Sequence, residues 1–146
     1  MPLAGETVRA GKIPGERAGT AKVTSSSGAI TTTETVVATV VFPAVAGRIY
    51  KITADIGFAV SVVTDRNLAS IREDSVSGSL LQQRNIGAPT TTSPWSYHIE
   101  TEYTADATED KTIVLTLQRN TGSGNITLAA GASQPSFLCA DYIRES

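Results

Sequence analysis

The chain has 146 residues, and 12 Lys and Arg against 14 Asp and Glu give a formal net charge of −2. That length suits one domain, the single cysteine excludes an internal disulfide framework, and no apolar run approaches the roughly 18 residues of a transmembrane helix. Because no apolar run is long enough, we expect no membrane insertion. The charge is nearly balanced and forms no basic patch, so we expect no nucleic-acid partner. Abundant Val and 20 Thr residues, beside sparse Leu, Glu and Lys, are typical of an all-β protein.

Residues 1–19 differ from the rest of the chain. They include four glycines and two prolines, and their few apolar residues follow no period, so they cannot bury a face of their own. Glu6 and Arg9 stand where a signal peptide would need an apolar block, so we expect no secretion by the usual route. We predict an extended attachment arm that lies on a neighbouring protein. Its contact residues are expected to be Leu3, Val8, Arg9 and Ile13.

Period-2 alternation begins after the arm and predicts one β-sandwich domain over residues 20–146. A short strand is expected at residues 21–25. Residues 35–42 form a near-continuous β-branched run, which is typical of a strand buried on both faces. Residues 50–58 show the clearest alternation in the chain, since an apolar side chain occupies every second position.

Two interpretations compete in the next segment. Residues 68–74 and 80–85 flank the Gly-containing loop 75–79, a pattern typical of a β-hairpin. The alternative is a helix over residues 65–75 with Asp65 as its N-cap. We favour the hairpin.

The second half of the chain repeats the alternating pattern. It predicts strands at residues 95–103, 112–117, 126–130 and 136–144. No helical pattern separates the strands, so the sheets must be mainly antiparallel. About eight strands in two packed sheets match a jelly roll, with an immunoglobulin-like sandwich as the second choice.

No catalytic group stands out. His98 is the only histidine, and it lies on the polar face of a predicted strand, where we expect an exposed bystander rather than a general base. Glu100 and Glu102 share that face roughly 6–7 Å apart, near the carboxylate spacing of inverting glycosidases. They point the same way from one strand, so we interpret them as a solvated face. A hydrolase that uses them is the third hypothesis, and we expect no enzyme.

Metal and cofactor sites are not predicted either. Residues 106–110 form an acidic turn that lacks the ligand spacing of an EF-hand loop. Neither paired cysteines nor a Gly-rich phosphate loop occur. Cys139 alternates with Phe137 and Ile143, which indicates a buried structural thiol. We therefore assign no catalytic, metal-binding or cofactor-binding residue.

One aromatic residue is a candidate for ligand contact. Trp95 shares the parity of expected core residues, but it follows Pro94 at the start of a strand, where it could lie at a rim. Core packing is the favoured interpretation. The alternative function is a carbohydrate- or receptor-binding module of a tail fibre, with Trp95 and the loops 87–94 and 120–125 near a host-surface glycan.

Three segments carry a resemblance to known proteins: residues 2–10 (PLAGETVRA), 71–78 (IREDSVSG) and 135–144 (PSFLCADYIR). In this order they resemble small virion proteins of actinobacterial tailed phages, of the minor tail or capsid decoration type, and the likeness spans nearly the whole chain. The resemblance implies a structural protein whose β-sandwich head projects from an N-terminal attachment segment, without catalytic residues. We expect a homotrimer that binds other virion proteins and is assembled in the host cytoplasm.

Overall fold

The computed structural model describes residues 14–146. The predicted contact residues of the arm lie outside this range: Leu3, Val8, Arg9 and Ile13. Residues 14–146 contain no helix of the length and hydropathy that a bilayer requires. They form the strands β1 (Arg17–Val23), β2 (Thr35–Ala44), β3 (Arg48–Val60), β4 (Arg66–Glu73), β5 (Leu80–Ile86), β6 (Trp95–Thr104), β7 (Glu109–Thr121), β8 (Ile126–Leu128) and β9 (Ser136–Glu145).

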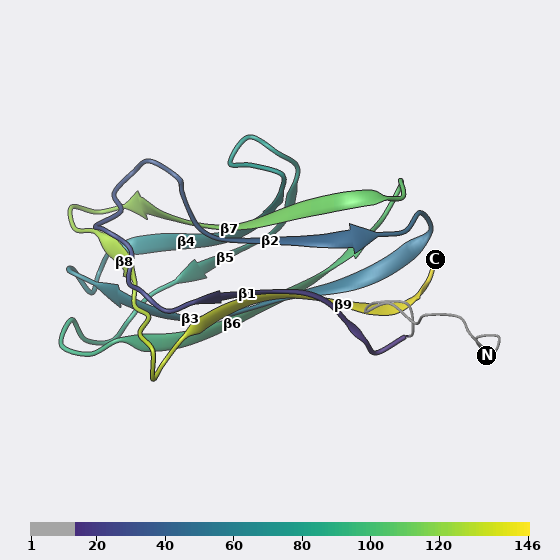
Figure 1. Ribbon diagram of the computed structural model, residues 1–146. Coiled ribbons are helices and arrows are strands. Elements are labelled where there is room, and N and C mark those ends of the chain that lie inside the picture. Colours follow the sequence, from purple (N-terminus) through teal and green to yellow (C-terminus); the bar gives the residue numbers. More distant parts are fainter. Residues whose placement is uncertain (1–13) are drawn as a thin grey trace, which may run out of the picture.

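The strands form two antiparallel sheets that lie face to face (Figure 1). The five-stranded sheet has the order β1-β9-β3-β6, with β8 also paired to β3, and the four-stranded sheet has the order β2-β7-β4-β5. The pairs are nested, β1 with β9, β2 with β7, β3 with β6 and β4 with β5, and successive pairs alternate between the sheets. This is the arrangement of a jelly roll, so the predicted fold class is confirmed.

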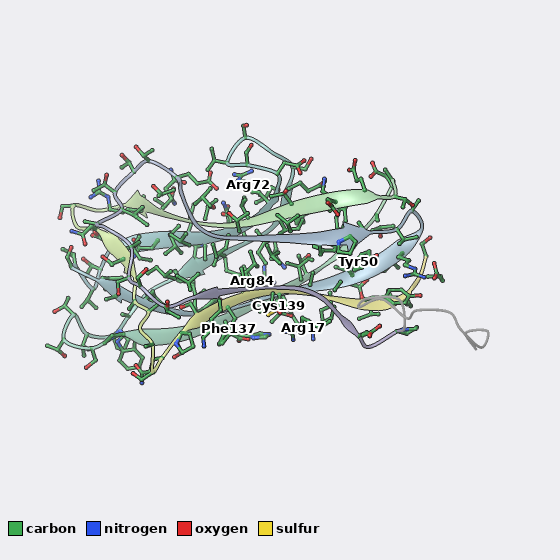
Figure 2. All side chains as sticks on the ribbon, in the orientation of Figure 1. Arg17, Tyr50, Arg72, Arg84, Phe137 and Cys139 are labelled. Carbon is green, nitrogen blue, oxygen red and sulfur yellow. The ribbon has the colours of Figure 1, made fainter. Side chains whose placement is uncertain are left out.

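Successive side chains of a strand point to opposite faces of its sheet, so every second residue fills the space between the sheets. β3 turns inward a row of apolar side chains that are at most 3% exposed: Tyr50, Ile52, Ala54, Ile56 and Phe58. The Tyr50 ring lies between the sheets (Figure 2), with its centroid 4.9 Å from that of Phe42 and 5.9 Å from that of Tyr142. Each such ring pair adds about 0.5–1.5 kcal/mol to the effect of burial alone.

β2 is buried on one face only, so the prediction of a strand buried on both faces is wrong. Its inward side chains are Ala38, Val40, Phe42 and Ala44. Val41, which points outward between them, is 56% exposed. β-Branched residues suit a pleated surface on either face, so a run of Val and Thr indicates a strand without showing how many faces are covered.

Residues 66–86 form the predicted hairpin rather than the alternative helix. β4 and β5 pair antiparallel, with Ile71 opposite Gln82. Asp65, the cap expected for the helix, is 7% exposed and accepts hydrogen bonds from the backbone N–H groups of Ser123 at 3.2 Å and Gly124 at 2.6 Å. Its carboxylate therefore holds the β7–β8 connection against the start of β4.

An ion pair ties two connections to the outer face of the four-stranded sheet. Arg72 of β4 (Figure 2) donates from Nε to Oε1 of Glu34 at 2.7 Å and from Nη2 to Oε2 at 3.2 Å. Arg72 Nη1 also donates to the carbonyl oxygen of Gly78 at 3.2 Å, and Thr116 Oγ1 donates to Glu34 at 2.5 Å. Burial raises the pKa of Glu34, but the hydrogen bonds from Arg72 and Thr116 outweigh burial and hold that pKa below its usual value.

A buried lysine joins β7 to the end of β4. Lys111 is 6% exposed, and its Nζ lies 2.6 Å from Oε2 of Glu73 and 3.2 Å from Oδ2 of Asp74. Burial lowers the pKa of Lys111, but the two carboxylates outweigh burial and raise that pKa overall. The ammonium group therefore stays charged within the fold.

The two ends of the sandwich carry different connections (Figure 1). β1 begins and β9 ends at one end, where the N–H of Gly15 donates to the carbonyl oxygen of Tyr142 at 2.6 Å. We call this the terminus end. Because strands β1 to β8 alternate in direction, the β1–β2, β3–β4, β5–β6 and β7–β8 connections lie at the opposite end, which we call the loop end. β1 starts at Arg17, within the predicted arm, and the domain division at residue 19 stays a prediction.

Candidate functional site

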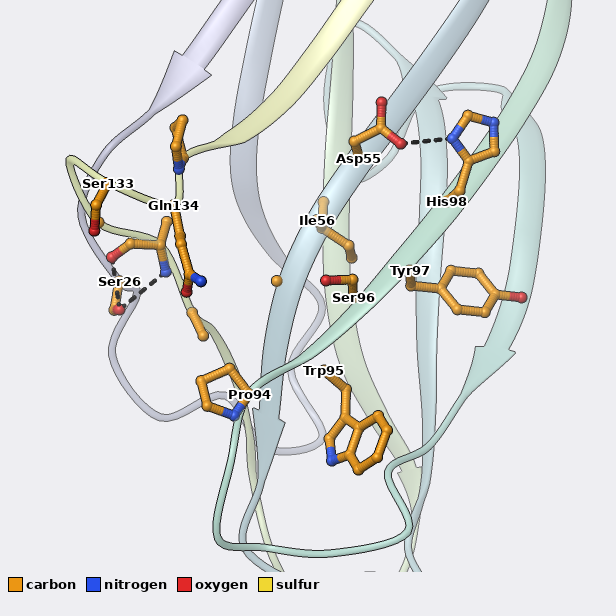
Figure 3. Close-up of a pocket in the computed structure, with 15 residues that line it drawn as sticks. Ser26, Asp55, Ile56, Pro94, Trp95, Ser96, Tyr97, His98, Ser133 and Gln134 are labelled. Atoms are coloured by element: carbon orange, nitrogen blue, oxygen red, sulfur yellow. Dashed lines mark hydrogen bonds and ion pairs between the residues drawn. The ribbon is translucent and has the colours of Figure 1, made fainter.

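A hollow of about 650 Å³ lies on the outer face of the five-stranded sheet, toward the loop end (Figure 3). Side chains at alternate positions of β3 and β6 point to this face, because their neighbours in sequence point into the core. The remaining wall is the connection between β8 and β9, residues 129–135, together with Ser26. The volume falls within the range of about 300–1,000 Å³ that is usual for ligand pockets.

Gly57 of β3 allows the 129–135 connection to lie directly on the sheet. The Gly57 N–H donates to Oγ of Ser136 at 3.0 Å, and its carbonyl oxygen accepts from the N–H of Ala129 at 2.9 Å. A Cβ atom on Gly57 would lie 2.3 Å from the carbonyl oxygen of Ala129. Glycine is therefore needed at this position for the close approach of the two backbones.

The 129–135 connection is held by hydrogen bonds of its own. Gly131 and Gln134 exchange backbone hydrogen bonds of 3.1 and 3.2 Å, which close a tight turn. Ser26 Oγ donates to the carbonyl oxygen of Ala130 and accepts from its N–H, both at 3.2 Å. These contacts fix the wall that carries Ser133 and Gln134 (Figure 3).

The opposite wall is an acid–imidazole pair. Asp55 and His98 are register partners on β3 and β6, and His98 Nδ1 lies 2.6 Å from Oδ1 of Asp55. His98 Nε2 lies 3.3 Å from Oε2 of Glu100. The hydrogen bond to Asp55, followed by that to Glu100, raises the pKa of His98 above its usual value. The imidazole is therefore held between a carboxylate of the neighbouring strand β3 and a carboxylate of its own strand β6.

Glu100 and Glu102 are each paired with a cation. Lys51 Nζ lies 2.7 Å from Glu100, and Arg144 binds Glu102 through two hydrogen bonds of 2.9 and 2.8 Å. The hydrogen bonds from Lys51 and Arg144 lower the pKa of Glu100 and of Glu102, respectively. A general acid needs a raised pKa, so this arrangement favours the interpretation of a solvated strand face over a hydrolase.

The other candidate residues do not form a site together. Within residues 14–146, no group of three or more His, Cys, Asp and Glu side chains is arranged to hold a metal ion. Cys139 is 6% exposed, so its predicted burial is confirmed. Arg17 Nη1 donates a hydrogen bond to its Sγ at 2.9 Å.

Trp95 lies at the start of β6 and is 38% exposed, so the favoured interpretation of core packing is wrong. It contributes to the lining of the hollow, but Figure 3 shows that its indole and the Tyr97 ring project from the other side of β6 than Ser96. Its role as a ligand rim stays a prediction. The sequence does not identify Asp55, Ser96 and the 129–135 wall as parts of one site, because the alternation of apolar and polar residues shows the face of a strand but not its neighbouring strand.

No protein-family model and no curated protein matches the chain. Among solved structures, the VP2 subviral particle of infectious bursal disease virus is similar over 87% of this chain and 37% of its own, with 15% identity and a TM-score of 0.45. The structure of the Gt strain of that virus is similar over 100% of this chain and 42% of its own, with 16% identity and a TM-score of 0.45.

A CBM4 structure is similar over 81% of this chain and 80% of its own, with 15% identity and a TM-score of 0.28. For the two viral structures, by contrast, the chain spans about two fifths of the length of the protein that it matches. At these identities the likenesses concern the fold alone. The chain is a jelly-roll β-sandwich.

Proposed function

We propose that the chain is a structural protein of a phage virion, either a capsid decoration protein or a minor tail component. The N-terminal arm, residues 1–19, attaches it to other virion proteins, and the sandwich projects outward. The protein performs no catalysis, and it is assembled in the host cytoplasm. The order of the three segments that resemble such proteins first suggests this role.

The observation that carries the proposal is the position of β1. β1 begins at the terminus end, so a partner that holds the chain directly before β1 would lie at that end of the sandwich (Figure 1). β3, the strand that runs the length of the sandwich, has 13 residues, and at roughly 3.3 Å per residue it spans about 40 Å. Attachment through the arm would thus hold the loop end about 40 Å from the anchor.

We propose further that the protein is a homotrimer. β1 and β6 are the edge strands of the five-stranded sheet, and an exposed sheet edge favours pairing with another chain. A closed trimer would cover one such edge in each subunit. Light scattering on the full chain tests this point, and a monomeric mass would contradict it.

Incorporation into particles tests the attachment. The double variant L3D/V8D of the full chain should fold normally and be lost from purified virions, because charged side chains would disrupt apolar contacts of the arm. V41D is the matched control, since Val41 is an exposed apolar residue of the sandwich. Full occupancy of L3D/V8D, beside normal occupancy of V41D, would refute attachment through residues 1–13.

A carbohydrate- or receptor-binding module of a tail fibre is the second candidate function. It is favoured by Trp95, which is exposed at the loop end beside the hollow. The variant W95A should then reduce adsorption of particles to the host while leaving incorporation unchanged. Unchanged adsorption would exclude a role for this indole.

A further inference from the structure

The hollow beside β6 brings polar groups together from three directions. Asp55 and His98 form one side, Ser96 lies between the two sides, and Ser133 and Gln134 lie across from them (Figure 3). The polar groups are thus a carboxylate, an imidazole, two hydroxyls and a side-chain amide. They include both hydrogen-bond donors and acceptors.

Apolar surface lies between these polar groups. The lining includes residues with wholly apolar side chains: Pro94, Pro135, Ala129 and Ala130. A sugar ring has a matching composition, with hydroxyl groups around its edge and C–H groups on its faces. Polar groups would orient such a ligand, while the apolar surface would bury its C–H groups.

The charge of the lining favours an uncharged ligand. Among the described residues that line the hollow there is no Lys or Arg, and the charged Asp55 is bonded to His98 at 2.6 Å. An anionic ligand would meet the Asp55 carboxylate, and the imidazole of His98, the basic side chain of the lining, is already paired with Asp55 and Glu100. A neutral hydroxylated ligand instead gains a charge-assisted hydrogen bond, because Asp55 can accept from a hydroxyl group.

The hollow is also formed in advance of binding. Its floor is a continuous ladder between β3 and β6, in which Gly57 pairs with Ser96. Its far wall is fixed by the hydrogen bonds of Ser26 to Ala130 and by the turn from Gly131 to Gln134. A ligand would therefore have little backbone to order, which lowers the free-energy cost of binding.

We propose that this hollow binds a neutral sugar unit of a glycan. Asp55 accepts hydrogen bonds from ring hydroxyls, Ser96 and Gln134 complete the polar contacts, and Pro94 and Pro135 lie against C–H groups. This inference deepens the second candidate function and does not depend on attachment to a virion.

Titration of the full chain, labelled with 15N, tests the site. The probes are neutral hexoses and pentoses and their disaccharides, with sialylated and sulfated sugars and a mixture of short peptides for comparison. We expect a neutral sugar to shift the amide signals of Gly57, Ser96, Gly131 and Gln134, with a dissociation constant of about 1 mM. Charged sugars should bind more weakly.

Two variants with matched controls identify the contacts. D55N should weaken binding about tenfold, because it removes the charge of the acceptor. E102Q removes a carboxylate from the same face of β6 outside the hollow and should bind normally. S96W should fill the floor and abolish binding, whereas T104W, at the other end of β6, should not. Circular dichroism checks that each variant is folded.

Several outcomes would overturn the proposal. One is that no neutral sugar at about 50 mM shifts the amide signals around the hollow. Another is a preference for charged sugars or peptides. A third is that D55N and S96W are folded and bind sugar as tightly as the wild-type protein does. Incorporation of D55N into particles is measured separately. Loss of sugar binding by D55N with normal incorporation assigns the defect to this site. A wild-type protein that binds sugar but is absent from particles would count against the virion role alone.

Discussion

Replacing Gly57 by alanine should displace the whole wall of the hollow. The added Cβ would lie 2.3 Å from the carbonyl oxygen of Ala129, whereas ordinary contact begins at 3.4 Å, so the connection must move by about 1 Å. That movement strains two hydrogen bonds, from Ala129 N–H to Gly57 and from Gly57 N–H to Ser136, which is 2% exposed. Buried polar groups that lose a partner cost about 1–3 kcal/mol each.

We therefore expect G57A to lower the free energy of unfolding by about 2–3 kcal/mol, after allowing for the better strand propensity of alanine. The melting temperature should fall by roughly 10 °C for a domain of this size. Guanidinium unfolding followed by far-UV circular dichroism measures the free energy. G87A is the matched control, because no atom lies within 4 Å of a Cβ at Gly87, and it should change stability by less than about 0.5 kcal/mol.

A G57A protein as stable as G87A would refute this reasoning. It would mean that residues 129–135 do not lie against β3 as described, and the wall of the proposed sugar site would then be missing. A destabilised G57A that still folds should also lose sugar binding, because Ser133 and Gln134 would move away from Asp55.

Three further changes follow from the ion pairs and the buried acid. E34Q should destabilise the protein by about 1–2 kcal/mol at pH 7. The folded pKa of Glu34 is lowered, so this contribution exists above the unfolded pKa of about 4.5 and is lost as the pH falls through the folded value. E34Q and wild type should therefore converge in urea unfolding at pH values below the folded pKa. K111M should cost about 2–4 kcal/mol in the same assay, because Glu73 would stay partly buried without its cation. D65A should cost about 2–3 kcal/mol and increase hydrogen exchange at residues 123 and 124, whereas unchanged exchange would contradict the role given to Asp65.

Much of the fold could be predicted because the sequence encodes the period of each strand. The apolar side chains of residues 50–58 are the inward row of β3, and the loop at residues 75–79 joins β4 to β5 as expected. Whether one face of a strand or both are covered by other parts of the protein depends on the position of the strand in the sandwich. Val41 therefore lies at an exposed outer face that its own sequence context does not reveal.

The candidate site was less accessible to sequence analysis. His98 was assigned to the polar face of its strand, but its partner Asp55 stands 43 residues earlier, and only the register between β3 and β6 brings them together. The same register places Gly57 beside Ser96. Even when every strand is predicted correctly, residues that pair across two strands stay unknown, because the register between the strands is decided by tertiary packing.

The nested pairing also sets an order in which the chain can fold. The innermost hairpin joins nearby positions, such as Ile71 and Gln82, whereas Arg17 and Asp141 of the outermost pair are 124 residues apart. Each inner pair shortens the loop that the next pair must close, so closure from β4–β5 outward is the least costly in chain entropy. β1 would then join the sheet last, after β9 has been synthesised. β1 would thus be held in the sandwich only after β9 has been made, which under the proposed function would keep nascent chains from competing for attachment.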